Sequence, residues 1–320
     1  MLTPHEPALV LAPMEGVTDA PMRAVMGESG AFTHAVSEFF RISQSVPGRA
    51  AIQRHVPELL TNGRTQTGLP VHVQLLGGDP DRLSSAAVVA VEAGAKAIDL
   101  NFGCPAPTVN RHDGGATLLK YPHRLRDIVR AVRSAVPQSV PVSAKLRLGW
   151  DNVDAIHLNA EMAVSGGASW LTIHARTRTQ GYAPPVNWQI VGRVRKQVGV
   201  PVVANGDIHT LDGFRRCREE TGCVHFMLGR GALATPDLPR QVAMELGLIP
   251  ISDSQPIDWP TRLQTLIDQT PRAVVQPTGR MVHRMKQWLR MAATFGDFRR
   301  FDAIKRANSV DELFSILRAA

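Results

Sequence analysis

Short apolar runs with strand-forming residues recur along the first 230 residues, and segments of helical periodicity separate them. Several runs are almost continuously apolar, as expected of parallel strands that helices cover on both faces. The helical segments are clearest at residues 83–93, 125–136 and 155–164, where apolar positions recur three and four residues apart. The strand-like runs are residues 9–14, 34–39, 71–76, 97–102, 142–148, 170–175, 201–206 and 225–230. Eight such units in about 245 residues predict an α/β fold, a (β/α)₈ TIM barrel.

The pattern changes after residue 247. Residues 249–260 contain Pro and Asp and read as a linker, and only helical periodicity follows, at residues 262–269, 279–293 and 310–319. The sequence therefore predicts a barrel domain over residues 1–247 and a small all-helical domain over residues 248–320. A doubly wound sheet is the alternative for the first part, but the G-x-G-x-x-G turn that follows its first strand is absent.

The positive charge is concentrated in the C-terminal segment. The chain has 36 Lys and Arg against 28 Asp and Glu, a net charge of +8. Residues 271–306 alone hold nine basic and two acidic residues, Arg272 among the basic ones. This distribution favours a polyanionic partner that the helical segment contacts, although a solvated helix face would give the same pattern.

Composition excludes several classes of protein. No apolar run approaches the ~20 residues that a membrane span needs, and residues 1–7 lack the basic and apolar regions of a secretory signal. Aromatic residues make up only 5%, too few for a base-stacking platform. The three cysteines, Cys104, Cys217 and Cys223, form no C-x-x-C pair. We therefore expect a cytoplasmic monomer with neither a membrane nor a metal partner.

Polar residues or glycines stand at the carboxyl ends of the predicted strands after the first, which ends at Pro13 and Met14. Barrels build their active sites at these ends. Buried polar groups cost roughly a few kcal/mol each unless they are satisfied, so a whole ring of them is costly without a ligand. Single members, such as Glu38 or Asn205, could instead cap helices. The set comprises Pro13, Met14, Glu38, Gln74, Asn101, Lys145, His174, Asn205, Gly229 and Arg230. Together they predict donors around a polar, planar, phosphorylated ligand.

The phosphate end of that ligand is expected at residues 204–207 and 228–232, which follow the last two strands. Glycine backbone N–H groups and a helix N-terminus favour an anion there, and Arg230 could pair with it bidentately. In a flavin site, Lys145 would stabilise the anionic reduced ring while Gln74 and Asn101 bond its polar edge. A Schiff-base lysine, as in barrel aldolases, is the alternative for Lys145.

The most specific local feature is the run Asn-Phe-Gly-Cys-Pro at residues 101–105. Gly103 and Pro105 stiffen the backbone that would carry Cys104 over the barrel mouth. We predict a general acid, because a thiol of ordinary pKa donates a proton at neutral pH. A nucleophile is the alternative, with His174 as its evident base, while Cys217 and Cys223 suit buried apolar positions. The Gly-rich residues 113–119 could close over the site as a lid.

Taken together, these segments resemble the tRNA-dihydrouridine synthases. The matching segments, in chain order, are residues 12–19, 99–105, 145–149, 174–182, 204–207 and 229–232. Within that family, residues 114–120, 148–151 and 284–289 are most similar to the bacterial C-type enzymes, which reduce the uridine at position 16 of the tRNA D-loop. Two residues depart from the pattern: Phe102 replaces a second cysteine of that subgroup, and Ala175 replaces the family's usual glycine.

The resemblance implies FMN across the barrel mouth, reduced by NADPH, with hydride passing from flavin N5 to uracil C6 and a proton from Cys104 to C5. It implies FMN contacts from Pro13, Met14, Glu15, Gln74, Lys145, His174, Asn205, Gly206, Asp207, Gly229 and Arg230. It also implies tRNA contacts from Arg41, Asn101, Tyr182, Arg284, Lys286 and Lys305, of which Asn101 and Tyr182 would hold the extruded uracil.

Two other functions stay open at this point. One is a small-molecule FMN oxidoreductase of the dihydroorotate or dihydropyrimidine dehydrogenase type. The basic segment at residues 271–306 argues against it. The other is a non-catalytic tRNA-binding protein, against which the intact set of Asn101, Cys104, Lys145 and His174 argues.

Overall fold

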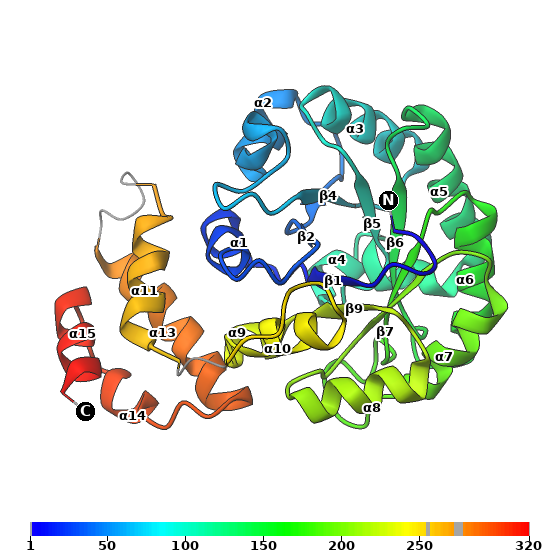
Figure 1. The fold of residues 1–320 in the computed structure, drawn as a ribbon. Helices are drawn as coiled ribbons and strands as arrows, with labels where there is room; N and C mark the ends of the chain where they lie inside the picture. The colour runs from blue at the N-terminus through cyan, green and yellow to red at the C-terminus, as the bar shows by residue number, and fades with distance from the viewer. Residues whose placement is uncertain (1, 254–256, 272–277, 320) are drawn as a thin grey trace.

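The computed structural model describes residues 2–253, 257–271 and 278–319, and its dominant feature is a closed barrel of parallel strands (Figure 1). Among these residues, eight strands pair around the barrel and the contact of β2 with β4 closes it. They are β1 (Ala8–Leu11), β2 (His34–Val36), β4 (Val71–Leu76), β5 (Ile98–Asn101), β6 (Val142–Arg147), β7 (Leu171–His174), β8 (Val202–Asn205) and β9 (His225–Leu228). The short β3 (Phe40–Arg41) adds to the edge of β4. The predicted barrel, with each of its eight strands, is confirmed.

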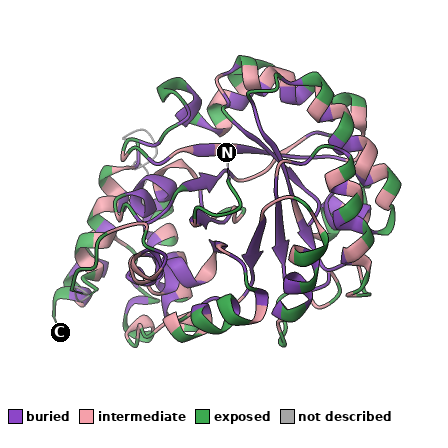
Figure 2. Ribbon diagram, turned by 45° about the vertical axis from the view of Figure 1, so that its right-hand side comes forward, coloured by how far each residue is buried: buried purple, intermediate pink, exposed green. Residues whose placement is uncertain are grey.

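Helices follow the strands and wrap the barrel. They are α1 (Ala20–Gly27), α2 (Arg49–His55), η1 (Pro57–Thr61), α3 (Pro80–Glu92), α4 (Pro107–Asn110), η2 (Gly115–Lys120), α5 (Pro122–Ala135), α6 (Ala155–Ser165), α7 (Trp188–Gln197), α8 (Leu211–Thr221), α9 (Arg230–Ala234) and α10 (Leu238–Glu245). In α5 the buried residues Leu125, Ile128, Val129 and Val132 follow the helical spacing. Figure 2 shows the result, with buried strands and with helices buried toward the barrel and exposed outside.

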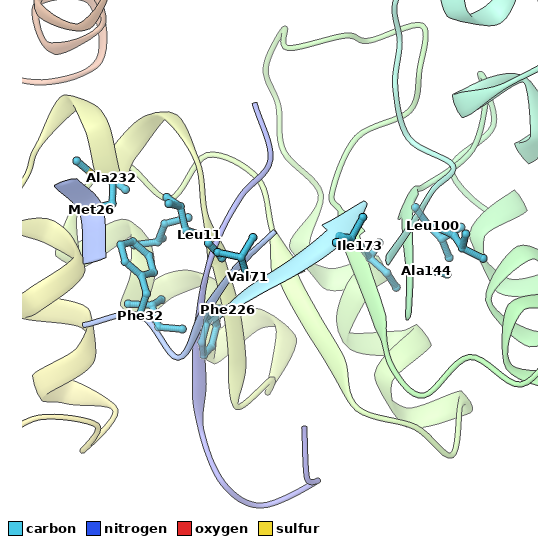
Figure 3. Close-up of a cluster of buried hydrophobic side chains, with 14 of the residues drawn as sticks. Leu11, Met26, Phe32, Val71, Leu100, Ala144, Ile173, Phe226 and Ala232 are labelled. Atoms are coloured by element: carbon cyan, nitrogen blue, oxygen red, sulfur yellow. The ribbon is translucent and has the colours of Figure 1, made fainter. Parts of the chain in front are cut away.

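Side chains alternate along the strands between two buried layers. Leu11, Leu100, Ala144, Ile173 and Phe226 belong to the layer between strands and helices (Figure 3). The positions between them face the barrel interior, where Val10, Val36, Trp170, Val203 and Met227 form a separate apolar cluster. The polar side chains at the strand ends lie on this inner face. They therefore line the inside of the barrel at its mouth.

The C-terminal part contains α11 (Trp259–Asp268), α13 (Thr278–Phe295), α14 (Phe301–Ile304) and α15 (Val310–Arg318). Figure 1 shows these helices gathered on one side of the barrel, next to α1 and α9. The predicted helices at residues 262–269, 279–293 and 310–319 correspond to α11, α13 and α15, whereas the single turn of α14 is too short for its periodicity to show. Arg272, counted in the basic segment, lies outside the described residues. No helix in the described part of the chain is long and apolar enough to cross a membrane.

Helix α13 connects the C-terminal helices to the barrel through both polar and close backbone contacts. The indole nitrogen of Trp288 donates to the carbonyl of Leu233 at 2.9 Å, and Gln287 donates to the carbonyl of Gly16 at 3.2 Å. Arg284 forms a two-point ion pair with Asp19, the N-cap residue of α1. This docking brings the end of α13 to the barrel mouth.

Candidate active site

A cavity of about 580 Å³ opens at the carboxyl ends of the barrel strands. That volume is typical of cofactor and small-molecule sites, which span ~300–1,000 Å³. Its walls include Pro13, Met14, Glu15, Gln74, Asn101, Cys104, Lys145, His174, Tyr182, Asn205, Gly206, Asp207, Gly229 and Arg230. The structure therefore brings together the residues to which the family resemblance assigned FMN contacts, along with Cys104 and the two residues expected to hold uracil, whereas Glu38 of the predicted ring does not line the cavity.

The other predicted tRNA-binding cations lie outside this cavity. Arg41 donates to the backbone carbonyl of Thr108 at 3.2 Å, and Lys305 pairs with its neighbour Asp302 at 2.6 Å. Lys286 is half-buried on α13. Arg284 is already neutralised by Asp19 of the barrel, so its visible role is to hold α13 in place.

The loop that carries Cys104 is held from two sides. The side-chain oxygen of Asn101 accepts from the backbone N–H groups of Gly103 and Cys104, each at 2.9 Å. On the other side Gly115 has φ +59°, and a Cβ there would lie 3.0 Å from the Cys104 carbonyl oxygen. Ala116 donates its backbone N–H to that same oxygen at 3.1 Å. Since η2 is buried against this loop and residues 113–119 do not line the cavity, the segment expected as a lid packs behind the Cys104 loop in this structure.

Burial governs the ionisation of the Cys104 thiol. It raises the pKa of Cys104, and the hydrogen bond from the backbone of Ala106 opposes this only in part. The thiol consequently keeps its proton at neutral pH. That state suits a proton donor and disfavours a thiolate nucleophile.

Gln74 and Asn101 belong to a buried chain of hydrogen bonds that sequence reasoning missed. Asn101 donates its side-chain amide to Gln74 at 2.8 Å, and Gln74 donates to Asp99 at 2.7 Å. Ser143 donates to the other oxygen of Asp99 at 2.6 Å. Burial raises the pKa of Asp99 to about 6. The strand period of two could have revealed Asp99 and Ser143, which precede Asn101 and Lys145 by two positions on the same inner face.

Lys145 and His174 are polar residues of the cavity wall whose charge or hydrogen-bonding capacity the described residues do not fully use. The Lys145 ammonium lies 3.4 Å from the side-chain oxygen of Asn205, and no carboxylate of the described residues pairs with it. Burial, reinforced by the charge of Arg147, lowers the pKa of Lys145 to about 8. Burial also lowers the pKa of His174, and its Nδ1 has no hydrogen-bond partner in the described part of the chain. Such groups fit a polar or anionic ligand bound between them.

The glycine-rich turn after β8 is organised by Asp207. Gly206 and Asp207 both have positive φ, +119° and +50°, and the Asp207 carboxylate pairs with Arg176 and with Arg230, the latter at 2.8 Å. Burial opposes ionisation of this carboxylate, but the hydrogen bonds from Arg176 and His209 hold its pKa far below the ordinary range. The ionised Asp207 therefore fixes Arg230 at the cavity edge.

Aromatic rings and a second arginine complete the mouth. Tyr182 is 54% exposed, and its ring lies 4.7 Å from the Arg230 guanidinium carbon and 5.2 Å from that of Arg147. Arg147 also donates to the carbonyl of Gly103 at 2.8 Å. Phe295 of α13 lies 4.6 Å from the Arg230 guanidinium. Neither Arg147 nor Phe295 was predicted. Arg147 ends β6 and follows Lys145 by two positions, so the strand period could have revealed it. The position of Phe295 depends on how α13 packs against the barrel.

Comparison with known proteins identifies relatives along nearly the whole chain. Residues 10–302 match the family described as dihydrouridine synthase (Dus). The chain is 45% identical to a tRNA-dihydrouridine(16) synthase of Pseudomonas putida, covering 88% of this chain and 87% of that protein. It is 42% identical to a tRNA-dihydrouridine(16) synthase of Aquipseudomonas alcaligenes, covering 96% of this chain and 99% of the relative.

A solved structure shares the fold. The old yellow enzyme homologue from Zymomonas mobilis superposes with a TM-score of 0.51 at 15% identity, covering 84% of this chain and 94% of that one. At this identity the likeness concerns the barrel fold alone. The family match supports more than a shared fold, because it extends from β1 through the barrel and into α13 and α14. The chain therefore belongs to the dihydrouridine synthase family.

Proposed function

We propose that this protein is a flavin-dependent tRNA-dihydrouridine synthase, which acts in the cytoplasm and reduces the C5–C6 double bond of the uridine at position 16 of the D-loop. The two relatives above are named for that position and are 42–45% identical over most of both chains. The observation that carries the proposal is the mouth cavity, in which Cys104, Lys145 and the turn at Gly206 surround one space.

The donor set of the cavity fits FMN. Lys145 has no carboxylate partner among the described residues, and the Nδ1 of His174 is buried and unpartnered, so a polar ring system would satisfy both. Glycine turns beside Arg230 suit a single phosphate. When bound and reduced by NADPH, FMN supplies the hydride that adds to uracil C6. We assign its contacts to Pro13, Met14, Glu15, Gln74, Lys145, His174, Asn205, Gly206, Asp207, Gly229 and Arg230.

Cys104 supplies the proton for uracil C5. Its raised pKa keeps the thiol protonated at neutral pH, and Asn101 fixes its loop through two backbone hydrogen bonds. The exposed ring of Tyr182 stands at the mouth, where an extruded base would arrive. A loop uridine leaves its stack at low cost, because few stacking and pairing contacts hold it.

We assign tRNA binding to residues 248–320 together with the rim of the barrel. Arg41, Lys286 and Lys305 would contact phosphates, which position a nucleic acid without reading its sequence. Arg284 would contribute chiefly by fixing the angle of α13 through Asp19. Since the same helix reaches the cavity, that angle would decide which uridine enters.

Purification tests the cofactor assignment directly. The protein should be yellow and release about one FMN per chain on denaturation, because the donor set that suits the flavin and its phosphate lines one cavity. With NADPH it should form dihydrouridine in an unmodified tRNA transcript. A colourless protein with no affinity for added FMN would contradict the proposal.

A further inference from the structure

The last two turns of helix α13 lie at the wall of the cavity. Met291 lines the cavity, and Phe295 follows one turn later. The Phe295 ring stacks on His209 with centroids 5.2 Å apart and planes 10° apart, and it lies 4.6 Å from the guanidinium carbon of Arg230. Since the Tyr182 ring lies 4.7 Å from the same carbon, Arg230 contacts one ring from the barrel and one from the C-terminal helices.

Phe295 is fixed relative to Arg230 by a close backbone contact. A Cβ at the next residue, Gly296, would lie 2.4 Å from the carbonyl oxygen of Ala234. Trp288 donates to the carbonyl of Leu233. Both carbonyls belong to α9, the helix that begins with Arg230. The end of α13 and the arginine thus form one packed unit.

This packing leaves Arg230 constrained but still able to bind. Its guanidinium donates to Asp207 at 2.8 Å, the single side-chain hydrogen bond it makes to the residues that the structure describes. Arginine has five N–H donors in a planar fork, so donors remain for an oxyanion. Contact with aromatic faces restricts the side chain without consuming those donors. A ligand phosphate would then meet an arginine already held in place.

We propose that Phe295 is a positioning residue for the cofactor phosphate, acting through Arg230. The C-terminal helices then complete the cofactor site as well as contacting tRNA, and their docking on the barrel is coupled to flavin affinity. This inference rests on the proposed function, because it takes the bound phosphate to be that of FMN.

A comparison of FMN with riboflavin tests this role, because the two share the ring system and only FMN carries a phosphate. Full-length protein stripped of flavin is titrated with each, and the quenching of flavin fluorescence is followed. Phe295→Leu should weaken FMN binding by about three- to thirtyfold, the range expected for a lost cation–π contact, and leave riboflavin binding within about twofold. Phe295→Tyr, which keeps the ring, should restore FMN affinity.

Two further variants separate positioning from general loosening. Phe298→Leu removes a ring three residues further on that packs against Trp259 at 5.6 Å, and it should leave FMN affinity unchanged. Adding Phe295→Leu to Arg230→Met should cause no further loss, because the residue through which Phe295 acts is gone. Equal losses of FMN and riboflavin, a matching loss in Phe298→Leu, or additive losses in the double variant would overturn the inference. Wild-type protein that binds neither flavin would overturn the proposed function and this inference with it.

Discussion

At the scale of single residues, Cys104 is held mainly through the backbone of its loop. Asn101 accepts its backbone N–H, Ala116 donates to its carbonyl, and Arg147 donates to the carbonyl of the preceding Gly103. The Sγ therefore has a defined position at the cavity wall while burial raises its pKa. A fixed, protonated thiol is what a proton donor to a bound base requires.

Replacing the thiol should separate the two half-reactions. We expect Cys104→Ala to bind flavin and oxidise NADPH normally but to lose uridine reduction by ~10²–10⁴-fold, the usual cost of a missing general acid. In wild type, reduction should decline at alkaline pH as the thiol loses its proton, with a midpoint above the ordinary cysteine pKa of about 8.5. Single-turnover rates across pH measure both effects. Wild-type yields of dihydrouridine from the variant would remove Cys104 from the mechanism.

Lys145 should destabilise the flavin-free protein. Its pKa of about 8 lies below that of an exposed lysine, so at higher pH the folded chain releases a proton that the unfolded chain keeps until about pH 10.4. Stability should thus rise with pH in that window. At pH 7, Lys145→Met should raise the free energy of unfolding by up to about 3 kcal/mol, while abolishing tight flavin binding.

Urea unfolding of flavin-free wild type and Lys145→Met at about pH 7 and pH 9.5 measures this effect. The difference in free energy of unfolding between Lys145→Met and wild type should be smaller at the higher pH, because the wild-type lysine is then neutral in the folded state. An equal difference in free energy of unfolding at both pH values would show that Lys145→Met acts through packing alone.

At the scale of elements, η2 sets the position of the loop that carries Cys104. Gly115→Ala would bring a Cβ to 3.0 Å from the Cys104 carbonyl oxygen, and we expect uridine reduction to fall by on the order of tenfold or more as the thiol shifts. Gly68→Ala is the matched control, since Gly68 also has positive φ, +85°, but no atom lies within 4 Å of its Cβ position. Flavin content and dihydrouridine yield of both variants provide the comparison. Equal activity losses would mean that backbone strain, rather than the contact with Cys104, is responsible.

The elements that the sequence predicted are those with enough residues to show a period. Eight apolar runs appear as strands, and polar residues at or near their carboxyl ends, such as Lys145 and His174, meet at one mouth because parallel strands all end there. The short β3, η2 and α14 offer too few residues for a pattern. The pairing of Arg230 with Phe295 could not be predicted either, because it depends on how closely Gly296 lets α13 approach α9.

At the scale of the whole molecule, the C-terminal helices are joined to the barrel on both flanks of the mouth. Arg284 and Gln287 bind the loop between β1 and α1, and Trp288 binds α9. A tRNA that contacts α13 therefore meets a helix whose orientation the barrel fixes. Under the proposed function, this arrangement would let phosphate contacts far from the cavity select the base that enters.

The salt dependence of tRNA binding tests which cations contact phosphate. Arg41→Ala and Lys286→Ala should each flatten the plot of log affinity against log salt by about one unit. Asp19→Asn keeps the N-cap of α1 but weakens the pair with Arg284, so its slope should be unchanged or steeper, because no cation is removed. A salt series by fluorescence anisotropy gives the slopes. Wild-type slopes in both alanine variants would show that Arg41 and Lys286 face solvent and do not contact phosphate.

Mapping dihydrouridine in cellular tRNA tests whether this chain makes dihydrouridine at position 16 with Cys104 as proton donor. In cells that lack this gene, dihydrouridine should disappear at position 16 and persist at other positions. The wild-type gene should restore it, and Cys104→Ala, expressed to the same level, should not. Unchanged dihydrouridine at position 16 in the deletion, or its loss at a different position, would contradict the account.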